Sequence, residues 1–486
     1  MASVVTIQKK LGAYYTPEEV TTTLVRWVVR NETDWLLDPA CGDGRFLANH
    51  QNTFGVECDC SGAVSAVERA PHATVYVGDF FTWAEETTAR FDCAAGNPPF
   101  IRYQHFRGDL RENALRVCSK IGVRFSGLAS SWAPFLAVTA SLLKSAGRMA
   151  FVVPAEIGHA PYAVPLIKYL KNHFTRVQIV AIRDKVFPDL SEDVWILFAD
   201  GFGGRTNEIL FSERQRFPTS AVPPRGRRVT DGEWTRWNCR LRPMLLSSGV
   251  RQLYQAMVES NEAVRFRAVA RVGIGYVTGS NDFFHLRPSE ASIWEIPSKC
   301  LLPTVRNARS LPPIVLDGKT IQHWRSRNEP YLLLRLTRGD SLPAPVRDYL
   351  DSPPGIEARA AYKCRHRRPW YVVPDVRIPH AFLSYMSGKT PQLAENKARC
   401  SCTNSVHAVE MINGWRTSTL RKVWQHPLAH LSCELEGHPL GGGMLKLEPG
   451  EAANIVLPLP RLSLGQSDLN LIHDGISTMQ VWRHYE

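Results

Sequence analysis

The first 200 residues of the chain alternate short apolar or β-branched runs with longer stretches of helical periodicity. This alternation is typical of an α/β fold, because a crossover between parallel strands is long enough to hold a helix that covers the sheet. Seven strands are expected, at Trp35–Asp38, Thr53–Glu57, Ala73–Gly78, Phe91–Ala95, Arg148–Val153, Arg176–Ile182 and Asp193–Phe198. The predicted fold class is therefore α/β, with a seven-stranded Rossmann-like sheet.

Two connections refine this topology. Ser131–Lys144, between the fourth and fifth strands, has apolar residues at helical spacing and is expected to form a crossover helix. The last two strands are joined only by Asp184–Glu192, which is too short for a helical crossover. An antiparallel pair is therefore expected at the end of the sheet.

The length of 486 residues exceeds that of one ordinary hydrophobic core, so two domains of about 200–250 residues each are expected. Glycine, proline and arginine are dense in Gly201–Arg205 and in Phe217–Arg228, as is typical of a linker. The expected organisation is a first domain over residues 1–205, a linker over 206–240 and a second domain over 241–486. The second domain lacks the regular alternation, which indicates a mixed α+β fold.

A glycine-bearing block, DPACGDGRFL, begins at Asp38 where the first expected strand ends. In an open parallel sheet, ligands bind beyond the carboxyl ends of the strands, and glycines such as Gly42 and Gly44 let the backbone approach them closely. Asp38 and Ala40 are further candidates for ligand contact. A glycine pair alone fits nucleotide sites and structural turns as well, so the neighbouring residues decide its meaning.

Acidic residues close the next two expected strands. Glu57 lies about twenty residues after Asp38, where a carboxylate can accept hydrogen bonds from two ribose hydroxyls. Asp79 can accept from an adenine amino group while Phe80 covers the ring. Each acid alone could be a helix cap or a solvated strand end, but three acidic strand ends in sequence indicate an adenosyl cofactor, S-adenosylmethionine.

The fourth expected strand is followed by Asn97, Pro98, Pro99 and Phe100. An exocyclic amine is a poor nucleophile, because its lone pair is delocalised into the ring. The side-chain carbonyl of Asn97 and the backbone carbonyl of Pro98 can each accept one amine hydrogen, which directs the lone pair toward the methyl group. The prolines stiffen the loop, and Phe100 offers a face on which a base can stack. The tetrapeptide indicates methyl transfer to an exocyclic nitrogen.

In their order along the chain, these blocks resemble the gamma class of bacterial DNA amino-methyltransferases, the group that includes the TaqI and PstI modification enzymes. Gly12–Pro17 matches the amino-terminal cofactor motif of that class. The resemblance implies cofactor contacts from Tyr15, Thr16, Pro17, Asn97 and Phe135. It also implies that Phe187 stacks on a base flipped out of duplex DNA.

Two positions depart from the pattern of the class. Phe100 stands where many relatives have tyrosine, and Asp38 stands where some have glutamate, so stacking and a carboxylate are both retained. The resemblance continues more weakly into the second half. There, Val272–Phe284 is similar to the entry into a target-recognition domain and Gly441–Pro449 to a segment near its end.

The chain has a formal net charge of +12, which is compatible with a polyanionic partner or with a basic surface that merely keeps the protein soluble. The segment Tyr362–Tyr371 interleaves cations with aromatic residues, a composition that suits phosphates and groove edges. Residues expected to contact DNA are Arg365, Arg367, Arg368, Trp370, Tyr371, Arg306 and Lys397, with Arg309 and Arg399 as lesser candidates.

The sequence gives little support for a metal-binding, secreted, membrane, nuclease or helicase protein. The 11 cysteines include no Cys-x-x-Cys pair, so no metal site is expected. The N-terminal residues lack the apolar core of a signal peptide and no run reaches membrane-spanning length, which favours the cytoplasm and no membrane partner. Asp375, Glu395 and Lys397 have the residue types of a nuclease but loose spacing, and no helicase P-loop is present.

The leading hypothesis is a site-specific DNA methyltransferase of a restriction–modification system that forms N6-methyladenine from S-adenosylmethionine. Methylation of cytosine N4 is chemically close to this reaction and fits the same residues. Protein glutamine methylation and DNA binding without catalysis are two weaker hypotheses. Double-stranded DNA and a cognate restriction endonuclease are the expected partners, and a monomer is expected because one strand can be methylated at a time.

Overall fold

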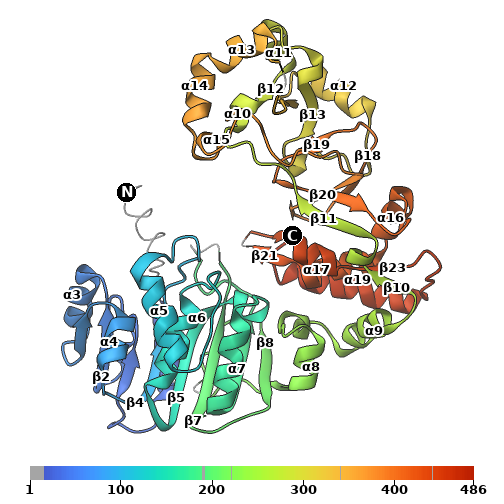
Figure 1. Cartoon of the computed structure of the whole chain (residues 1–486). Coiled ribbons are helices and arrows are strands. Elements are labelled where there is room, and N and C mark those ends of the chain that lie inside the picture. The colour runs from blue at the N-terminus through green and yellow to red at the C-terminus, as the bar shows by residue number, and fades with distance from the viewer. Residues whose placement is uncertain (1–15, 189–191, 221, 340, 441, 486) are drawn as a thin grey trace. The chain divides into compact units, whose positions relative to one another are not determined.

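The computed structural model describes residues 16–188, 192–220, 222–339, 341–440 and 442–485. The chain divides into two compact units, Met1–Leu245 and Leu246–Glu486 (Figure 1). We describe each unit separately.

A sheet with the order β3-β2-β1-β4-β5-β7-β6-β8-β9 organises the first unit. Its strands are β1 (Leu36–Asp38), β2 (Thr53–Glu57), β3 (Thr74–Val77), β4 (Phe91–Gly96), β5 (Leu143–Pro154), β6 (Phe174–Ile182), β7 (Val194–Phe202), β8 (Glu208–Arg214) and β9 (Arg227–Thr230). All seven expected strands are present, and the α/β prediction is confirmed. β6 and β7 are antiparallel, as expected from their short connection.

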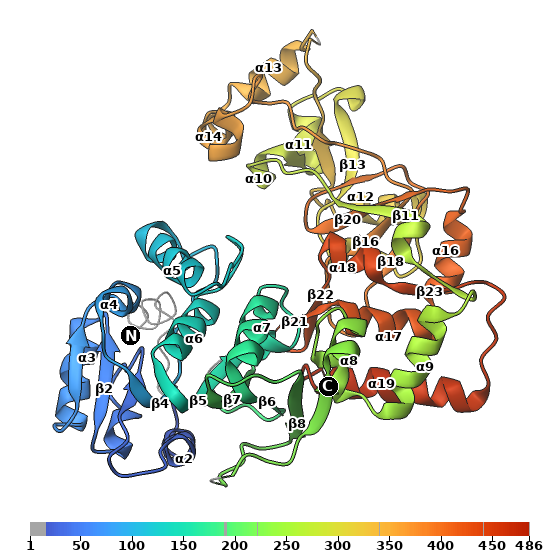
Figure 2. The same cartoon turned by 60° about the horizontal axis from the view of Figure 1, so that its bottom comes forward.

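Helices cover both faces of this sheet, with α2 on one side and α6 and α7 on the other (Figure 2). The helices of the unit are α2 (Glu18–Val28), α3 (Cys60–Arg69), α4 (Phe80–Glu86), α5 (Gly108–Lys120), α6 (Trp132–Ser141), α7 (Ala163–His173) and α8 (Asp231–Arg236). The expected crossover helix is α6, although it ends before Lys144. The reason is that β5 already begins at Leu143, which pairs with Phe91 across an irregularity in the ladder.

The expected linker over residues 206–240 is wrong. These residues form β8, β9 and α8, and β8 joins the sheet beside β6 in parallel register. Ile209, Phe211 and Val229 are fully buried in these two strands, so burial of apolar surface holds the segment on the sheet. Of the two glycine- and proline-rich segments, Gly201–Arg205 leads from the end of β7 toward β8, and Phe217–Arg228 leads from β8 into its antiparallel partner β9.

The second unit has a mixed α+β fold, as predicted. A five-stranded sheet has the order β11-β20-β16-β18-β14, and a four-stranded sheet has the order β12-β15-β13-β19. Two smaller sheets have the orders β17-β22-β21 and β10-β23. The described residues contain no helix that is long and apolar enough to span a membrane.

The strands of the second unit are β10 (Ala263–Arg265), β11 (Ala270–Ile274), β12 (His285–Leu286), β13 (Leu301–Val305), β14 (Val315–Leu316), β15 (Leu332–Leu334), β16 (Ala381–Ser384), β17 (Met386–Ser387), β18 (Leu393–Asn396), β19 (Ser401–Cys402), β20 (Val406–Met411), β21 (His438–Leu440), β22 (Met444–Lys446) and β23 (Val456–Pro458). Its helices are α9 (Ser248–Glu259), α10 (Asn281–Phe284), α11 (Pro288–Ile293), α12 (Gly318–Ser326), α13 (Ala344–Leu350), α14 (Pro353–Ala360), α15 (Tyr362–Arg365), α16 (Thr417–Trp424), α17 (Pro427–Glu436), α18 (Pro449–Asn454) and α19 (Gln466–Val481).

Candidate active site

Four neighbouring parallel strands end in the polar residues that the sequence singles out. In the spatial order β3-β2-β1-β4, the strand ends carry or lead into Asp79, Glu57, Asp38 and Asn97. The chain order reverses between β1 and β4, which makes this the switch point at which open α/β sheets bind their ligands. Asp38 and Asn97 lie on the two sides of that point.

Asp38 is a buried carboxyl group at the end of β1. Only 1% of the residue is exposed, and its Oδ1 accepts a hydrogen bond of 3.2 Å from the Ala40 N–H. Its Oδ2 has no hydrogen-bond partner among the described residues. Burial, together with the nearby charges of Glu57 and Asp43, raises the pKa of Asp38 to about 8. A cationic ligand group would stabilise the ionised form of this carboxyl.

Asp38 also lies against the start of the clamp loop, Asn97–Phe100. A Cβ added to Gly96, the residue before Asn97, would be 2.7 Å from the Asp38 Oδ1. Only glycine therefore allows β4 to approach this carboxyl so closely. The close approach brings the backbone before Asn97 next to the Asp38 carboxyl.

The glycine block forms a tight loop that rests on α3. Gly42 and Gly44 both have positive φ, 54° and 81°. A Cβ on Gly44 would lie 2.8 Å from the Ala66 Cα, so this position requires glycine for packing as well as for conformation. The Gly42 N–H donates to the Glu57 Oε2 at 2.8 Å, and Glu57 Oε1 accepts from the Asp59 N–H. Glu57 thus shapes the loop, and its expected contact with a ribose stays a prediction.

Asp79 is the N-cap of α4, a role that its position in the sequence also allowed. Its Oδ1 accepts from the backbone N–H of Thr82 at 2.8 Å and from the Thr82 hydroxyl at 2.9 Å. The next residue, Phe80, stacks on Phe135 of α6 with ring centroids 5.0 Å apart and an interplanar angle of 13°. The structure therefore brings together the two aromatic rings that are expected at the cofactor.

Thr16 connects the N-terminal motif to the clamp. The Asn97 Nδ2 donates to the Thr16 Oγ1 at 3.2 Å, and the Arg45 Nη1 donates to the Thr16 carbonyl at 3.2 Å. Pro17 directly precedes α2 as its N-cap residue. The remaining residue expected in this motif, Tyr15, lies outside the described residues.

The two phenylalanines expected to hold the target base belong to one apolar cluster. Phe187 is 7% exposed and is part of the buried core beneath α2, and the partly buried Phe100 packs against that core. Phe187 is therefore packed in the core in this structure rather than presented as an open face. Its expected stacking on a flipped base stays a prediction.

Some residues of the site have no counterpart in the sequence analysis. Asp43 Oδ2 accepts from the Arg45 Nε at 3.0 Å and from the Arg69 Nη2 at 2.9 Å, which ties the glycine block to α3. Ser131 contacts the clamp loop directly. Asp43 and Arg45 stand inside the block already singled out, whereas Ser131 lies 30 residues from its partner Ile101 and carries no local signal.

Comparison with known proteins identifies the family. The family model for the C-terminal domain of the Type II methyltransferase M.Eco57I matches residues 239–481, which is half of the chain. The chain belongs to the M.Eco57I family of Type II methyltransferases. Models for the Eco57I restriction-modification methylase and for N-6 DNA methylases match residues 58–187 and 4–66. The protein is thus a DNA methyltransferase of restriction–modification systems, and S-adenosylmethionine is its methyl donor.

Individual relatives are similar in sequence over most of the length of this methyltransferase. It is 20% identical to the Type II methyltransferase M.AccI of Acinetobacter calcoaceticus, over 96% of this chain and 89% of that protein. It is 23% identical to M.XamI of Xanthomonas campestris pv. amaranthicola, over 92% of this chain and 85% of that protein. Among solved structures, the Type IIL restriction-modification enzyme MmeI in complex with DNA has a similar fold. The TM-score is 0.51 at 11% identity, over 90% of this methyltransferase and 62% of the MmeI chain.

In the second unit of the methyltransferase, part of the expected DNA-contacting set is structural. Arg367 donates to the carbonyl oxygens of Thr278 at 2.6 Å and Val277 at 2.5 Å, and burial lowers its pKa. The half-buried Trp370 and Tyr371 pack on a core that includes Phe283. These three side chains thus have structural contacts within the domain, and their expected contact with DNA stays a prediction.

The remaining candidates of that set differ in exposure. Arg365 and Arg368 are exposed near α15, with the Arg365 guanidinium 5.3 Å from the Tyr362 ring centroid. Arg306 forms an ion pair of 3.3 Å with Asp282. Lys397, Arg309 and Arg399 are exposed. Their contact with DNA stays a prediction.

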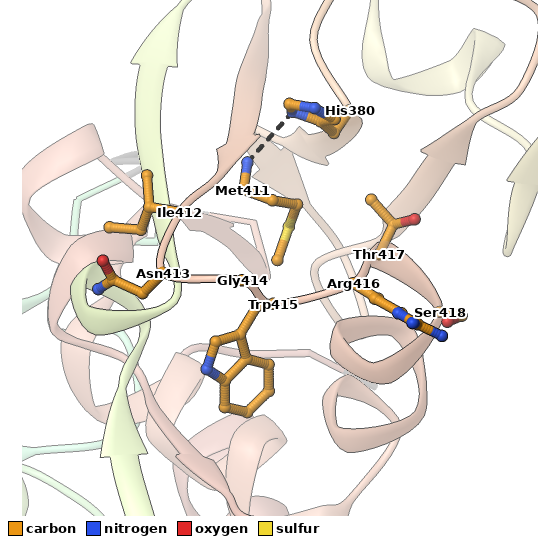
Figure 3. Close-up of a pocket in the computed structure, with 9 residues that line it drawn as sticks. All are labelled: His380, Met411, Ile412, Asn413, Gly414, Trp415, Arg416, Thr417 and Ser418. Atoms are coloured by element: carbon orange, nitrogen blue, oxygen red, sulfur yellow. Dashed lines mark hydrogen bonds between the residues drawn. The ribbon is translucent and has the colours of Figure 1, made fainter.

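A hollow of about 540 Å³ lies between the end of β20 and the start of α16 (Figure 3). His380, Trp415 and Arg416 are among its lining residues, and the His380 Nδ1 accepts from the Met411 N–H at 3.2 Å. None of the residues expected to contact DNA lines it. The hollow belongs entirely to the second unit of the methyltransferase, whereas the strand-end site lies entirely within the first.

Proposed function

We propose that this methyltransferase transfers a methyl group to the exocyclic N6 of an adenine that is flipped out of duplex DNA. The observation that carries the proposal is the placement of Asp38 and Asn97 on the two sides of the switch point between β1 and β4. A cofactor bound beyond β1 and a base held by the loop after β4 would therefore be neighbours. The match of residues 4–66 to N-6 DNA methylases supports adenine as the target.

The residues at the strand ends fit S-adenosylmethionine. Asp38 offers a buried carboxyl whose Oδ2 has no partner among the described residues, which suits a positively charged group of the cofactor. Glu57 can accept from ribose hydroxyls, and the Asp79 carboxylate can accept from an adenine amino group. Phe80 and Phe135 supply apolar walls. The remaining proposed cofactor contacts are Tyr15, Thr16, Pro17, Ala40, Gly42 and Gly44.

S-adenosylmethionine supplies an electrophilic methyl group at its sulfonium. The chain has to make a delocalised amine nucleophilic in front of it. The Asn97 Nδ2 donates to Thr16, and this bond orients the amide so that its carbonyl oxygen can accept one amine hydrogen. The Pro98 carbonyl would accept the second hydrogen. With both hydrogens held, the nitrogen would become more tetrahedral, so that its lone pair is less delocalised into the ring and is aimed at the methyl group.

Base flipping is the step that brings the adenine into this site, because its amino group is inaccessible within the duplex stack. We propose Phe100 and Phe187 as the apolar contacts of the flipped base. We further propose that residues 246–486 select the DNA site. The residues proposed to contact phosphates or groove edges are Arg365, Arg367, Arg368, Trp370, Tyr371, Arg306 and Lys397. A monomer that works beside a separate cognate endonuclease completes the proposal.

The target base can be identified directly. The chain is expressed in a host that lacks DNA methylation, its DNA is digested to nucleosides, and methylated nucleosides are detected by mass spectrometry. N6-methyladenine is expected, and sequencing of modified bases then gives the recognition site. N4-methylcytosine alone would overturn the assignment of adenine, and methylated glutamine in protein with unmodified DNA would overturn DNA as the substrate.

A further inference from the structure

Ser131 is fully buried and stands directly before α6, in the N-cap position. Serine at this position ordinarily stabilises a helix by accepting a hydrogen bond from a backbone N–H of its first turn. The Ser131 side chain makes no such bond. A buried hydroxyl that does not cap its own helix needs another set of partners.

The partners of Ser131 are in the clamp loop and the residue that follows it. Its Oγ donates to the Pro99 carbonyl and accepts from the Ile101 N–H at 2.9 Å, and its own N–H donates to the Ile101 carbonyl at 3.0 Å. The three hydrogen bonds bracket Phe100 from both sides. Ser131 therefore fixes the peptide groups before and after Phe100, the residue proposed to contact the base.

The composition of the loop explains why such an anchor is needed. Pro98 and Pro99 have no backbone N–H, so they cannot be held by donated hydrogen bonds. Their rings fix φ but leave ψ free, and the ψ of Pro99 determines where its carbonyl points. By holding that carbonyl, Ser131 removes the remaining freedom of the loop between the Pro98 acceptor and Phe100.

We propose that Ser131 is a positioning residue for methyl transfer, which acts by locking the Pro98–Phe100 loop in the geometry that receives the target base. The inference rests on the proposed function of that loop. Ser131 contacts neither base nor cofactor in this account. Its loss should therefore affect the rate of transfer and the environment of the flipped base, and leave cofactor binding intact.

The test compares Ser131→Ala with Ser141→Ala. Ser141 is on the same helix, but its hydroxyl donates to the Val138 carbonyl within that helix at 2.7 Å. With enzyme in excess over DNA, Ser131→Ala is expected to slow transfer about 10–100-fold, with an unchanged Kd for S-adenosylmethionine. Ser141→Ala is expected to transfer at the wild-type rate. Ser131→Cys, which keeps the size but weakens both side-chain bonds, should fall between serine and alanine.

A second readout separates positioning from a loss of stability. DNA with 2-aminopurine at the target position reports stacking of the flipped base through its fluorescence. Ser131→Ala should change the fluorescence of the saturated complex, because Phe100 is no longer fixed. Transfer by Ser131→Ala at the wild-type rate, or unchanged fluorescence of its complex, would overturn the inference.

Asn97→Ala distinguishes this inference from the function on which it rests. If Asn97→Ala abolishes transfer while Ser131→Ala transfers at the wild-type rate, only the role of Ser131 is wrong. If Asn97→Ala itself transfers methyl groups at the wild-type rate, the proposed clamp is wrong.

Discussion

At the scale of single residues, the charge of Asp38 depends on what the site contains. Its pKa of about 8 results first from burial and then from the charges of Glu57 and Asp43. The carboxyl is thus largely protonated at neutral pH when no cation is nearby. A positively charged cofactor group beside it would lower the pKa again and favour ionisation.

This coupling predicts that binding of S-adenosylmethionine releases a proton near pH 7 and tightens as pH rises through about 8. Calorimetric titrations in buffers of different ionisation enthalpy measure the released proton. Asp38→Asn, which keeps the shape and cannot ionise, should abolish both the proton release and the pH dependence. Cofactor affinity that is independent of pH in the wild-type protein would contradict a contact between Asp38 and the cationic part of the cofactor.

The ionisation of Asp38 also affects the stability of the fold, but here a rise in pH is unfavourable, whereas it favours cofactor binding. Because the pKa of Asp38 is higher in the folded than in the unfolded chain, the folded state binds the proton more strongly. The contribution to stability is therefore present at pH 4 and is lost as pH rises toward 8. Without cofactor, Asp38→Asn should melt at a higher temperature than wild type at pH 8, and scans at pH 5 should reduce or reverse the difference.

At the scale of elements, the glycine loop and α3 form one packed unit. Gly44→Ala is expected to destabilise the fold by about 2–4 kcal/mol, since it places a side chain at positive φ and against the backbone of Ala66. Gly232→Ala in α8 is the matched control, because its Cβ would meet only the Thr230 Oγ1 at 4.0 Å. Urea unfolding measures both variants, and equal midpoints for them would contradict the close packing of the loop.

The elements also show what the sequence could and could not predict. β1 to β7 were predictable because they form short apolar or β-branched runs between stretches of helical periodicity. The strand-end residues Asp38, Glu57, Asp79 and Asn97 follow from their positions. β8 and β9 were missed because the connection between them has the composition of a linker. Ser131 was missed because its partners are distant in the chain, and the half-buried Arg367 resembles its exposed neighbours in sequence.

At the scale of the whole molecule, the net charge of +12 is compatible with DNA as the partner, and we propose that the second unit selects the DNA site. The topology of that unit could not be predicted, because its sheet order β11-β20-β16-β18-β14 pairs short strands that are far apart in the chain. Binding to duplex DNA is expected to weaken at least about tenfold between 50 and 200 mM salt, because phosphate contacts release counterions. Cofactor binding should change little over the same range.

Arg365, Arg367 and Arg368 are close in sequence and differ in exposure, so their variants can be compared with each other to test which of them contact DNA. Arg365→Ala or Arg368→Ala is expected to lower the slope of log affinity against log salt by about 1 without altering stability. Arg367→Ala should instead destabilise the protein by about 1–3 kcal/mol, since it removes the guanidinium that donates to the Thr278 and Val277 carbonyls. Filter binding measures the salt slope and urea unfolding measures the stability. If the salt slope is unchanged in both Arg365→Ala and Arg368→Ala, these two residues do not contact DNA phosphates.

The most direct test of the clamp is the rate of methyl transfer by Asn97→Ala, measured with labelled S-adenosylmethionine and enzyme in excess over DNA. Asn113→Ala is the control. The Asn113 side chain resembles that of Asn97 in donating from its Nδ2 to a threonine hydroxyl, here that of Thr82, but Asn113 is on α5 and not in the clamp loop. We predict that Asn97→Ala slows transfer at least about 100-fold with DNA still bound, and that Asn113→Ala transfers at the wild-type rate. Wild-type transfer by Asn97→Ala would contradict the account.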